Sequence, residues 1–262
     1  MSFYDWIYSE YPSNSSLEIN SRYGILHILT IILCIGICVG ISFLRKKNEK
    51  TKRTVLFIIA GLILFFELAR RIINISRGVD GLNSWLYLLL PRPWCAIACW
   101  CFMASTLVNK RFFYNFVSMI SLLCALVFLV HPNVGFDGRA ILFENIYSIF
   151  THALLFIGAV SIITLGFADF SYIGKEKTLK SSALWELLCL AIMYAYAFFE
   201  AFALKIEIDP LMFRQGNDVQ DVLGVSYGLY LVIYILFLAL YFNAFYLINA
   251  FVKRRINKVK IN

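Results

Sequence analysis

Long apolar runs without a single charge are the feature that most constrains how this chain folds. Residues 24–44, 112–130 and 222–252 carry no Asp, Glu, Lys or Arg over 21, 19 and 31 positions. A helix needs about 20 apolar residues, each rising about 1.5 Å, to cross the hydrocarbon core of a bilayer, which is about 30 Å thick. The three runs therefore predict transmembrane helices.

The composition of the chain excludes a soluble protein. Of its 262 residues, 61% are hydrophobic and only 15% are charged, whereas a soluble domain is usually about 45–50% apolar and about 25% charged. Such a chain has too little polar surface to cover a globule in water. A soluble enzyme, a secreted disulfide scaffold and a disordered regulator are therefore excluded.

Four further apolar stretches, which contain isolated polar groups, complete the set of predicted spans. They lie at about residues 54–77, 84–108, 142–168 and 182–206. Barrel strands would alternate over about 10 residues, so these stretches are too long for a barrel. We expect an all-α polytopic membrane bundle of seven transmembrane helices, forming a single domain over residues 1–262.

The basic residues orient this bundle, because cytoplasmic loops of membrane proteins are enriched in Lys and Arg. The first, third and fifth predicted loops and the C-terminal tail hold 16 of the 24 basic residues. These are Arg45, Lys46, Lys47, Lys50, Lys52, Arg53, Lys110, Arg111, Lys175, Lys177, Lys180, Lys253, Arg254, Arg255, Lys258 and Lys260. We therefore expect segment 1–23 outside and the basic tail 253–262 in the cytoplasm, in a multi-pass protein of the cell membrane.

The net charge of +8 is interpreted as this topology signal together with attraction to anionic lipid headgroups. We expect membrane lipids as partners and no nucleic acid, because no basic patch is interleaved with aromatic residues on a soluble element. We also expect no metal or cofactor. All seven cysteines fall within predicted spans and show no zinc-binding spacing, so they are interpreted as small buried hydrophobic residues.

Two pairs of glycines have the GxxxG spacing. Gly36 and Gly40 lie in the first predicted span, and Gly224 and Gly228 lie in the last. Small residues four positions apart let helix backbones approach closely. Both pairs predict close packing inside the bundle, with a homodimer through the same faces as the alternative.

Ionisable and reactive side chains are concentrated in the outer half of the predicted bundle. They are Glu67, Arg70, Arg71, Arg92, Cys95, Glu144, His152 and Glu200. The spacing of Glu67, Arg70 and Arg71 places them on one helical face, and Glu144 and His152 share another face. Because ionisable groups at membrane depth are costly, they are usually buried, paired and functional.

The third predicted span is interrupted by Pro91 and Pro93, which flank Arg92. Two prolines remove two amide donors and leave carbonyls without their helical partners. In lipid such carbonyls must be satisfied by protein or water, so this break should line a polar cavity.

Two interpretations of these polar groups remain open. The first is a pocket that opens toward the outer leaflet and holds a substrate. Its substrate-binding residues would be Glu67, Arg70, Arg71, Arg92, Glu144 and Glu200. In the second, the charged residues form structural ion pairs, Glu144 is an interfacial carboxylate, and His152 is a hydrogen-bonded core histidine.

Three short motifs carry a family resemblance. They are Leu90–Cys95, residues 131–135 and Thr151–Ala153. They are similar to an L-P-L-H-L-C pattern, in which Pro93 stands at the histidine, to a Thr-Pro-like turn and to a Ser-His-Gly-like histidine. Over roughly residues 55–170, the chain therefore resembles the YwaF family of bacterial integral membrane proteins.

One eukaryotic relative of that family is a transmembrane acyltransferase that acts on ether phospholipids. The resemblance implies that a cysteine thiolate, activated by His152, passes an acyl chain from one lipid to another. Cys95 would be the catalytic nucleophile and His152 the catalytic base.

Three functions are compatible with these features. The first is a lipid-acting acyltransferase or hydrolase, with His152 as base and Cys95 or Ser148 as nucleophile. The second is a transporter or substrate-binding membrane component for a small anionic solute, held by Arg70, Arg71 and Arg92. The third is a non-enzymatic scaffold or receptor-like membrane protein.

Overall fold

The structure is a computed structural model, and it describes most of the chain. The described residues are 20–21, 23–76, 89–91, 94–130, 135–136, 141–170, 183–203 and 215–261. Regular structure in this part of the chain is entirely helical, as the sequence predicted. The predictions that rest on Arg92, Pro93 and residues 131–134 lie outside the described residues.

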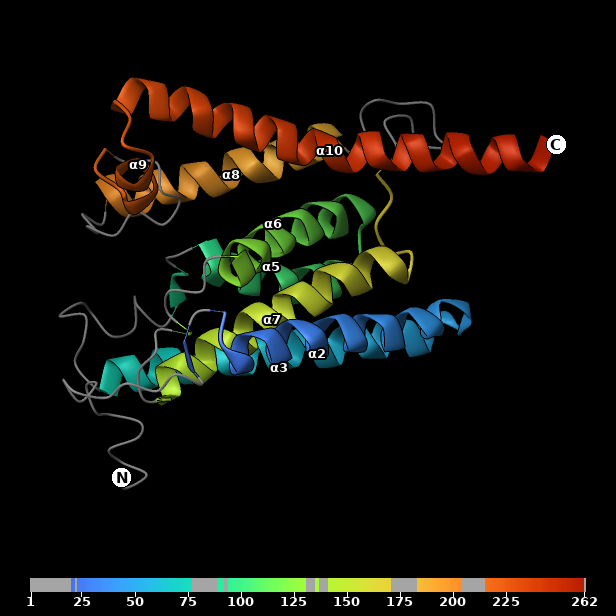
Figure 1. The fold of residues 1–262 in the computed structure, drawn as a ribbon, viewed down its shortest axis with the longest axis horizontal. Helices are drawn as coiled ribbons and strands as arrows, with labels where there is room; N and C mark the ends of the chain where they lie inside the picture. The colour runs from blue at the N-terminus through green and yellow to red at the C-terminus, as the bar shows by residue number, and fades with distance from the viewer. Residues whose placement is uncertain are drawn as a thin grey trace. The chain divides into compact units, whose positions relative to one another are not determined.

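The described helices, shown in Figure 1, follow the predicted order of spans. They are α2 (Ile25–Ser42), the 3-10 helix η2 (Phe43–Lys46), α3 (Glu49–Ser76), α5 (Trp94–Val108), α6 (Arg111–Val130), α7 (Phe143–Thr164), α8 (Ala183–Phe202), α9 (Asp218–Leu223) and α10 (Tyr227–Ile261). Each of the seven predicted spans overlaps one of the longer helices. Among the described residues, four segments are long and apolar enough to cross a membrane: Ile25–Lys46, Arg111–Val130, Phe143–Thr164 and Tyr227–Val252. The count of seven spans and their orientation stay predictions.

Polar side chains fix where two of these helices begin. Asn48 stands directly before α3, and its Oδ1 accepts a hydrogen bond from the backbone N–H of Thr51 at 2.8 Å. At the start of α7, Asn145 Oδ1 accepts from the backbone N–H of Leu142 at 3.0 Å. Such contacts satisfy amide groups that a helix terminus leaves without partners.

The chain divides into two compact units. The first contains Met1–Lys110 and Val117–Phe167, and the second contains Arg111–Phe116 and Ala168–Asn262. Helix α6 therefore begins in the second unit and continues in the first. The expectation of a single domain over residues 1–262 stays a prediction.

In the first unit, α3 packs against α5 and α7, and α2 packs against α7 (Figure 1). Helices α3 and α7 are antiparallel. At one end, Lys52 Nζ donates to the Leu165 carbonyl at 3.4 Å. At the other end, the Tyr147 hydroxyl reaches Glu67 at 2.8 Å.

Gly158 of α7 is a point of close packing among these helices. A Cβ atom built on Gly158 would lie 2.5 Å from the ring of Phe102 in α5 and 3.2 Å from Ile59 in α3. Phe102 is fully buried and Ile59 is 6% exposed, so neither side chain has open space into which it could move. A glycine here lets the three backbones approach, the role of small residues in membrane helix packing.

We expect Gly158→Ala to lower the free energy of unfolding by about 1–3 kcal/mol, the usual cost of overpacking a core. Thermal unfolding of the purified protein in detergent would measure this loss. Gly61→Ala on α3 is the matched control, because nothing lies within 4 Å of a Cβ built there. The control should be neutral or slightly stabilising, since alanine is the better helix former. Equal stability of Gly158→Ala and the unsubstituted protein would contradict this packing.

Side chains from the start of α2 cap the C-terminus of α6. His27 is buried, and its Nε2 lies 3.0 Å from the Leu129 carbonyl. The Tyr23 hydroxyl donates to the Val130 carbonyl at 2.7 Å. The Tyr23 backbone N–H donates to Nδ1 of His27 at 3.2 Å. Because Nδ1 accepts, the proton is on Nε2, which donates to Leu129. These bonds satisfy carbonyls that the last helical turn leaves without partners.

The structure corrects the interpretation of the two glycine pairs. Gly224 is not part of the last span, because it ends α9 with a φ of +62° and α10 begins only at Tyr227. The Gly224–Gly228 pair therefore forms no helical face, and that part of the prediction is wrong. Gly36 and Gly40 do lie on α2, but nothing comes within 4 Å of a Cβ built on either. The prediction that Gly36 and Gly40 pack against another described helix is therefore also wrong. A homodimer through this face of α2 stays a prediction.

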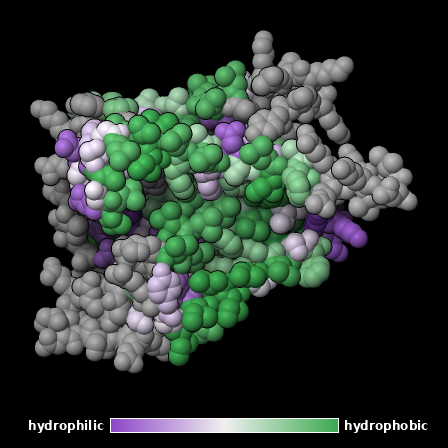
Figure 2. All heavy atoms as spheres, turned by 45° about the horizontal axis from the view of Figure 1, so that its top comes forward, coloured by the Kyte–Doolittle hydropathy of each residue, from purple (hydrophilic) through white to green (hydrophobic). Residues whose placement is uncertain are grey.

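Large apolar side chains cover the outside of several helices, and Figure 2 shows them over much of the face in view. On α2, Ile32 and Leu33 are 58% and 63% exposed, and on α10 Leu240 is 71% exposed. Monomeric soluble proteins rarely expose large contiguous apolar patches. This surface is suited to contact with lipid chains. Helix α10 also continues beyond the predicted span, so most of the predicted basic tail, 253–262, is helical.

Candidate functional site

A buried carboxylate, Glu67 of α3, is the centre of the polar groups in the first unit. Its side chain is fully buried. Oε1 accepts a hydrogen bond from Arg71 Nε at 2.6 Å, and Oε2 accepts from the Tyr147 hydroxyl of α7 at 2.8 Å. Arg70 Nη2 lies 3.5 Å from the same Oε1. These partners compensate a charge whose burial would otherwise be very costly.

Arg71 is as buried as its partner, with 1% of its side chain exposed. Its Nη1 donates to the Leu90 carbonyl at 2.8 Å, and its guanidinium lies 5.9 Å from the Trp100 ring of α5. Leu90 immediately precedes Pro91, so a side-chain donor satisfies a carbonyl at the predicted interruption. The guanidinium of Arg70 lies over the ring of Tyr147, 5.0 Å from its centroid.

The helical spacing predicted that Glu67, Arg70 and Arg71 share one face, and the structure confirms this. The pairing corresponds to the interpretation in which these residues form structural ion pairs. Two hydrogen bonds of the Glu67–Arg71 pair lead away from α3, one from the Tyr147 hydroxyl to Glu67 and one from Arg71 to the Leu90 carbonyl. The pair therefore ties α3 to α7 and to the segment before α5.

His152 of α7 is only partly buried, and its ring is held in one orientation. Nδ1 lies 2.7 Å from the Ser148 carbonyl, and the ring stacks on Phe128 of α6 at 4.1 Å with an interplanar angle of 7°. A carbonyl only accepts, so Nδ1 carries the proton of the neutral ring and Nε2 carries the lone pair. Nε2 has no hydrogen-bond partner among the residues that the structure describes. This arrangement is the one that a histidine acting as a general base requires.

Cys95, near the start of α5, lies at the same level of the bundle as His152. Helices α5 and α7 both run antiparallel to α3, so they are parallel to each other, and Phe102 faces Gly158. Cys95 precedes Phe102 by seven residues and Thr151 precedes Gly158 by seven, so both lie about 10 Å from that contact.

A buried hydroxyl without a partner lies at this level. Thr151 is fully buried, and its Oγ1 finds no hydrogen-bond partner in the described part of the chain. Between the Cys95 thiol and the His152 ring the described structure shows no hydrogen bond. Buried polar groups in native proteins are nearly always hydrogen-bonded, so an unsatisfied group indicates a site where water or a ligand binds.

Comparison with known proteins gives this chain a family. The profile of the TMEM164 family, a family of transmembrane proteins, matches residues 20–248. This chain belongs to the TMEM164 family. No curated protein and no solved structure matches it.

Glu67, Arg70, Arg71 and Tyr147 form one cluster of polar side chains. The remaining predicted site residues of this TMEM164-family membrane protein are not part of it. Glu144 is exposed in the first turn of α7. Glu200 belongs to the second unit, where its Oε1 accepts a hydrogen bond from the Tyr196 hydroxyl at 2.7 Å. Arg92 lies outside the described residues. No group of three or more His, Cys, Asp or Glu side chains that could hold a metal ion occurs among the described residues.

A second buried carboxylate of this TMEM164-family chain, which the sequence did not single out as a site, lies in the second unit. Glu186 of α8 is 5% exposed, and its Oε1 accepts from the Asn115 side-chain amide at 2.9 Å. Its Oε2 accepts a hydrogen bond from the Tyr246 hydroxyl of α10. Asn115 also exchanges two bonds with the backbone of Asp169, at 2.8 and 2.9 Å. The sequence signal was a polar Asn and a Glu within two mostly apolar predicted spans.

Proposed function

We propose that this TMEM164-family protein is a lipid-acting enzyme of the cell membrane that transfers acyl chains through a thioester. One observation carries the proposal. His152 keeps its Nε2 lone pair without a partner among the described residues, at the level of Cys95. The proposal also includes seven transmembrane spans with the N-terminus outside the cell. It further includes the predicted resemblance to the YwaF family of bacterial membrane proteins.

The reaction proceeds in two balanced steps. Nε2 of His152 takes the proton of the Cys95 thiol, and the thiolate attacks the ester carbonyl of a donor lipid. The acyl–oxygen bond breaks, and the imidazolium returns its proton to the leaving alkoxide, which departs as a lysolipid hydroxyl. In the second step, an acceptor lipid hydroxyl gives its proton to Nε2 and attacks the thioester. The carbon–sulfur bond breaks, and the imidazolium returns the proton to the departing Cys95 thiolate. A nucleophile paired with a base is the usual requirement of acyl transfer.

A positive charge near the reacting carbonyl stabilises the oxyanion in each step. Arg70 supplies such a charge, because its guanidinium lies over the ring of Tyr147, five residues before His152 on α7, and its side chain remains 19% exposed. Arg71 is less suited to this role or to holding a solute, because Glu67 and the Leu90 carbonyl already engage it. The contacts therefore favour acyl transfer over binding of a small anionic solute through both arginines.

The covalent intermediate is the first test. Intact-protein mass spectrometry after incubation with phospholipid vesicles should show an acyl-sized adduct that hydroxylamine removes. The adduct should be lost in Cys95→Ala, because no other thiol is expected to receive the acyl chain. Cys101→Ala is the matched control, since Cys101 is also a half-buried cysteine of α5, and it should keep the adduct.

Two results would overturn this proposal. An adduct that survives in Cys95→Ala would place the nucleophile elsewhere, and Ser148→Ala would then test the neighbouring hydroxyl. Measurable acyl transfer without any adduct on the unsubstituted protein would exclude the thioester. Absence of both adduct and transfer would reject acyl transfer altogether.

A further inference from the structure

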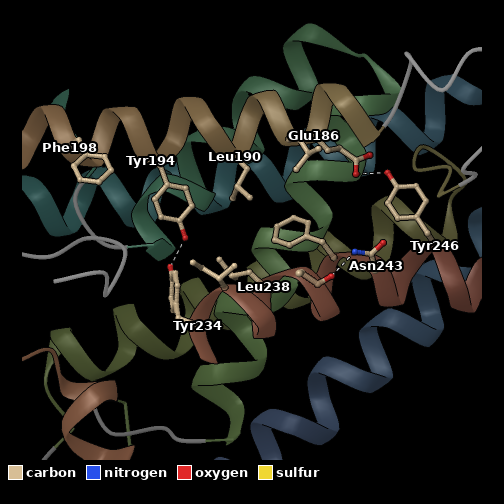
Figure 3. Close-up of a pocket in the computed structure, with 12 residues that line it drawn as sticks. Glu186, Leu190, Tyr194, Phe198, Tyr234, Leu238, Asn243 and Tyr246 are labelled. Carbon is tan, nitrogen blue, oxygen red and sulfur yellow. Dashed lines mark hydrogen bonds between the residues drawn. The ribbon is translucent and has the colours of Figure 1, made fainter. Parts of the chain in front are cut away.

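A cavity of about 550 Å³ lies between α8 and α10 of the second unit. This is within the range of about 300–1,000 Å³ that is typical of small-molecule sites. Figure 3 shows Glu186, Leu190, Tyr194 and Phe198 of α8 along one wall of the cavity. These residues recur every four positions and span about 18 Å of helix. The cavity is therefore long, and its lining is mostly apolar.

The polar groups of the cavity are concentrated toward its two ends. At one end the Tyr246 hydroxyl donates to Glu186, and toward the other the Tyr194 hydroxyl donates to that of Tyr234 at 2.7 Å (Figure 3). Between them lie apolar side chains such as Leu190 and Leu238. An apolar passage with a carboxylate at one end suits an amphiphile with one chain and a polar headgroup.

The Glu186 contacts indicate the charge of that headgroup. Both of its oxygens accept hydrogen bonds, from Asn115 and from Tyr246, as the two oxygens of an ionised carboxylate do. Both donors are neutral, and no Lys, Arg or His of the described residues forms an ion pair with it. The nearby Arg111 lies 3.8 Å from the Asp169 carboxylate instead. A buried carboxylate is stabilised by a cation that is hydrogen-bonded to it, so the site is suited to a positive group.

We propose that this cavity binds a single-chain cationic amphiphile, with its protonated amine at Glu186 and its alkyl chain along the apolar wall toward Phe198. A fatty acid would bring its carboxylate to Glu186 and be repelled. A fatty alcohol would contact the same apolar walls but would make no ionic contact with Glu186. In the proposed topology α8 begins at the cytoplasmic side, so the amine lies near the headgroup region and the chain lies in the hydrocarbon. This proposal does not depend on the acyl-transfer reaction.

The test compares three probes of equal chain length, tetradecylamine, tetradecanol and tetradecanoate. Each is titrated into the full-length protein in nanodiscs of zwitterionic lipid, and binding is read by native mass spectrometry. We expect tetradecylamine to bind about 10- to 100-fold more tightly than tetradecanol, the usual contribution of a hydrogen bond to a charged group. Tetradecanoate should bind most weakly.

Variants separate the headgroup contact from the cavity. Glu186→Gln should remove the preference for the amine, whereas Glu144→Gln, which changes an exposed carboxylate of the first unit, should leave it intact. Leu190→Trp should weaken binding of the amine and of the alcohol, because the larger side chain fills the cavity.

Equal binding of amine and alcohol to the unsubstituted protein would overturn the proposal. So would an amine preference that survives in Glu186→Gln, or unchanged amine binding in Leu190→Trp. The Leu190→Trp result decides the question if Glu186→Gln fails to fold. Because none of these variants changes Cys95 or His152, failure here is distinguishable from failure of the acyl-transfer proposal.

Discussion

Replacing Arg71 by methionine is expected to lower the free energy of unfolding by about 3–5 kcal/mol, the usual cost of leaving one member of a buried ion pair without its partner. Glu67 is fully buried and would keep the Tyr147 hydroxyl and the longer 3.5 Å contact with Arg70, but it would lose the 2.6 Å bond to Arg71 Nε. The Leu90 carbonyl would lose its donor in the same variant. Thermal unfolding of the purified protein in detergent, followed by tryptophan fluorescence, measures the change.

A second variant and a double variant show whether the loss arises from the buried charge. Arg70→Met should lower the free energy of unfolding less than Arg71→Met does, because Arg70 is partly exposed and lies 3.5 Å from Glu67. Glu67→Leu combined with Arg71→Met should recover part of the stability lost in Arg71→Met, since an apolar pair leaves no charge buried. An Arg71→Met protein as stable as the unsubstituted one would contradict the structural role of this ion pair.

The local part of this cluster could be predicted from the sequence, and the tertiary part could not. Glu67 and Arg71 are four residues apart, and helical periodicity alone brings such residues together. Tyr147 is 80 residues from Glu67, so its contact depends on how α3 packs against α7. That packing includes the close approach at Gly158, whose role appears only when Phe102 and Ile59 are in place.

The Glu186 network shows the same limit in the second unit. Asn115 and Tyr246 are 71 and 60 residues from Glu186 in sequence, and no spacing rule links the three. The sequence did place each of them in or beside a predicted span. Three residues from three helices become one site only when those helices are packed.

The predicted start of the last span, at residue 222, is wrong because hydropathy does not detect helix ends: α10 begins at Tyr227. Residues 222–252 form one charge-free run, yet Asn217 caps the short helix α9 and Gly224 ends it in the left-handed conformation. Asn at an N-cap and Gly after a C-terminus are sequence signals in their own right. Read together with the apolar run, they would have moved the start of the span toward Tyr227.

His152→Gln is expected to lower the rate constant of acyl transfer by about 10²- to 10⁴-fold, the usual contribution of a general base. Glutamine retains a donor for the Ser148 carbonyl, but it has no nitrogen lone pair in the position of Nε2. Its effect on the unfolding temperature should be small, because the ring of His152 is only partly buried. The measurement follows transfer of a labelled acyl chain from a donor phospholipid to a lysolipid acceptor in vesicles, at matched amounts of folded protein.

His27→Gln is the matched control, because His27 has both ring nitrogens engaged, by the Tyr23 amide and the Leu129 carbonyl. Its substitution should lower stability while the transfer rate per folded molecule stays unchanged. If His152 were only a core histidine, the two variants would behave alike: both would lose stability, and neither would lose transfer per folded molecule. A rate loss confined to His152→Gln therefore identifies Nε2 as the base, and an unchanged rate would leave Cys95 without one.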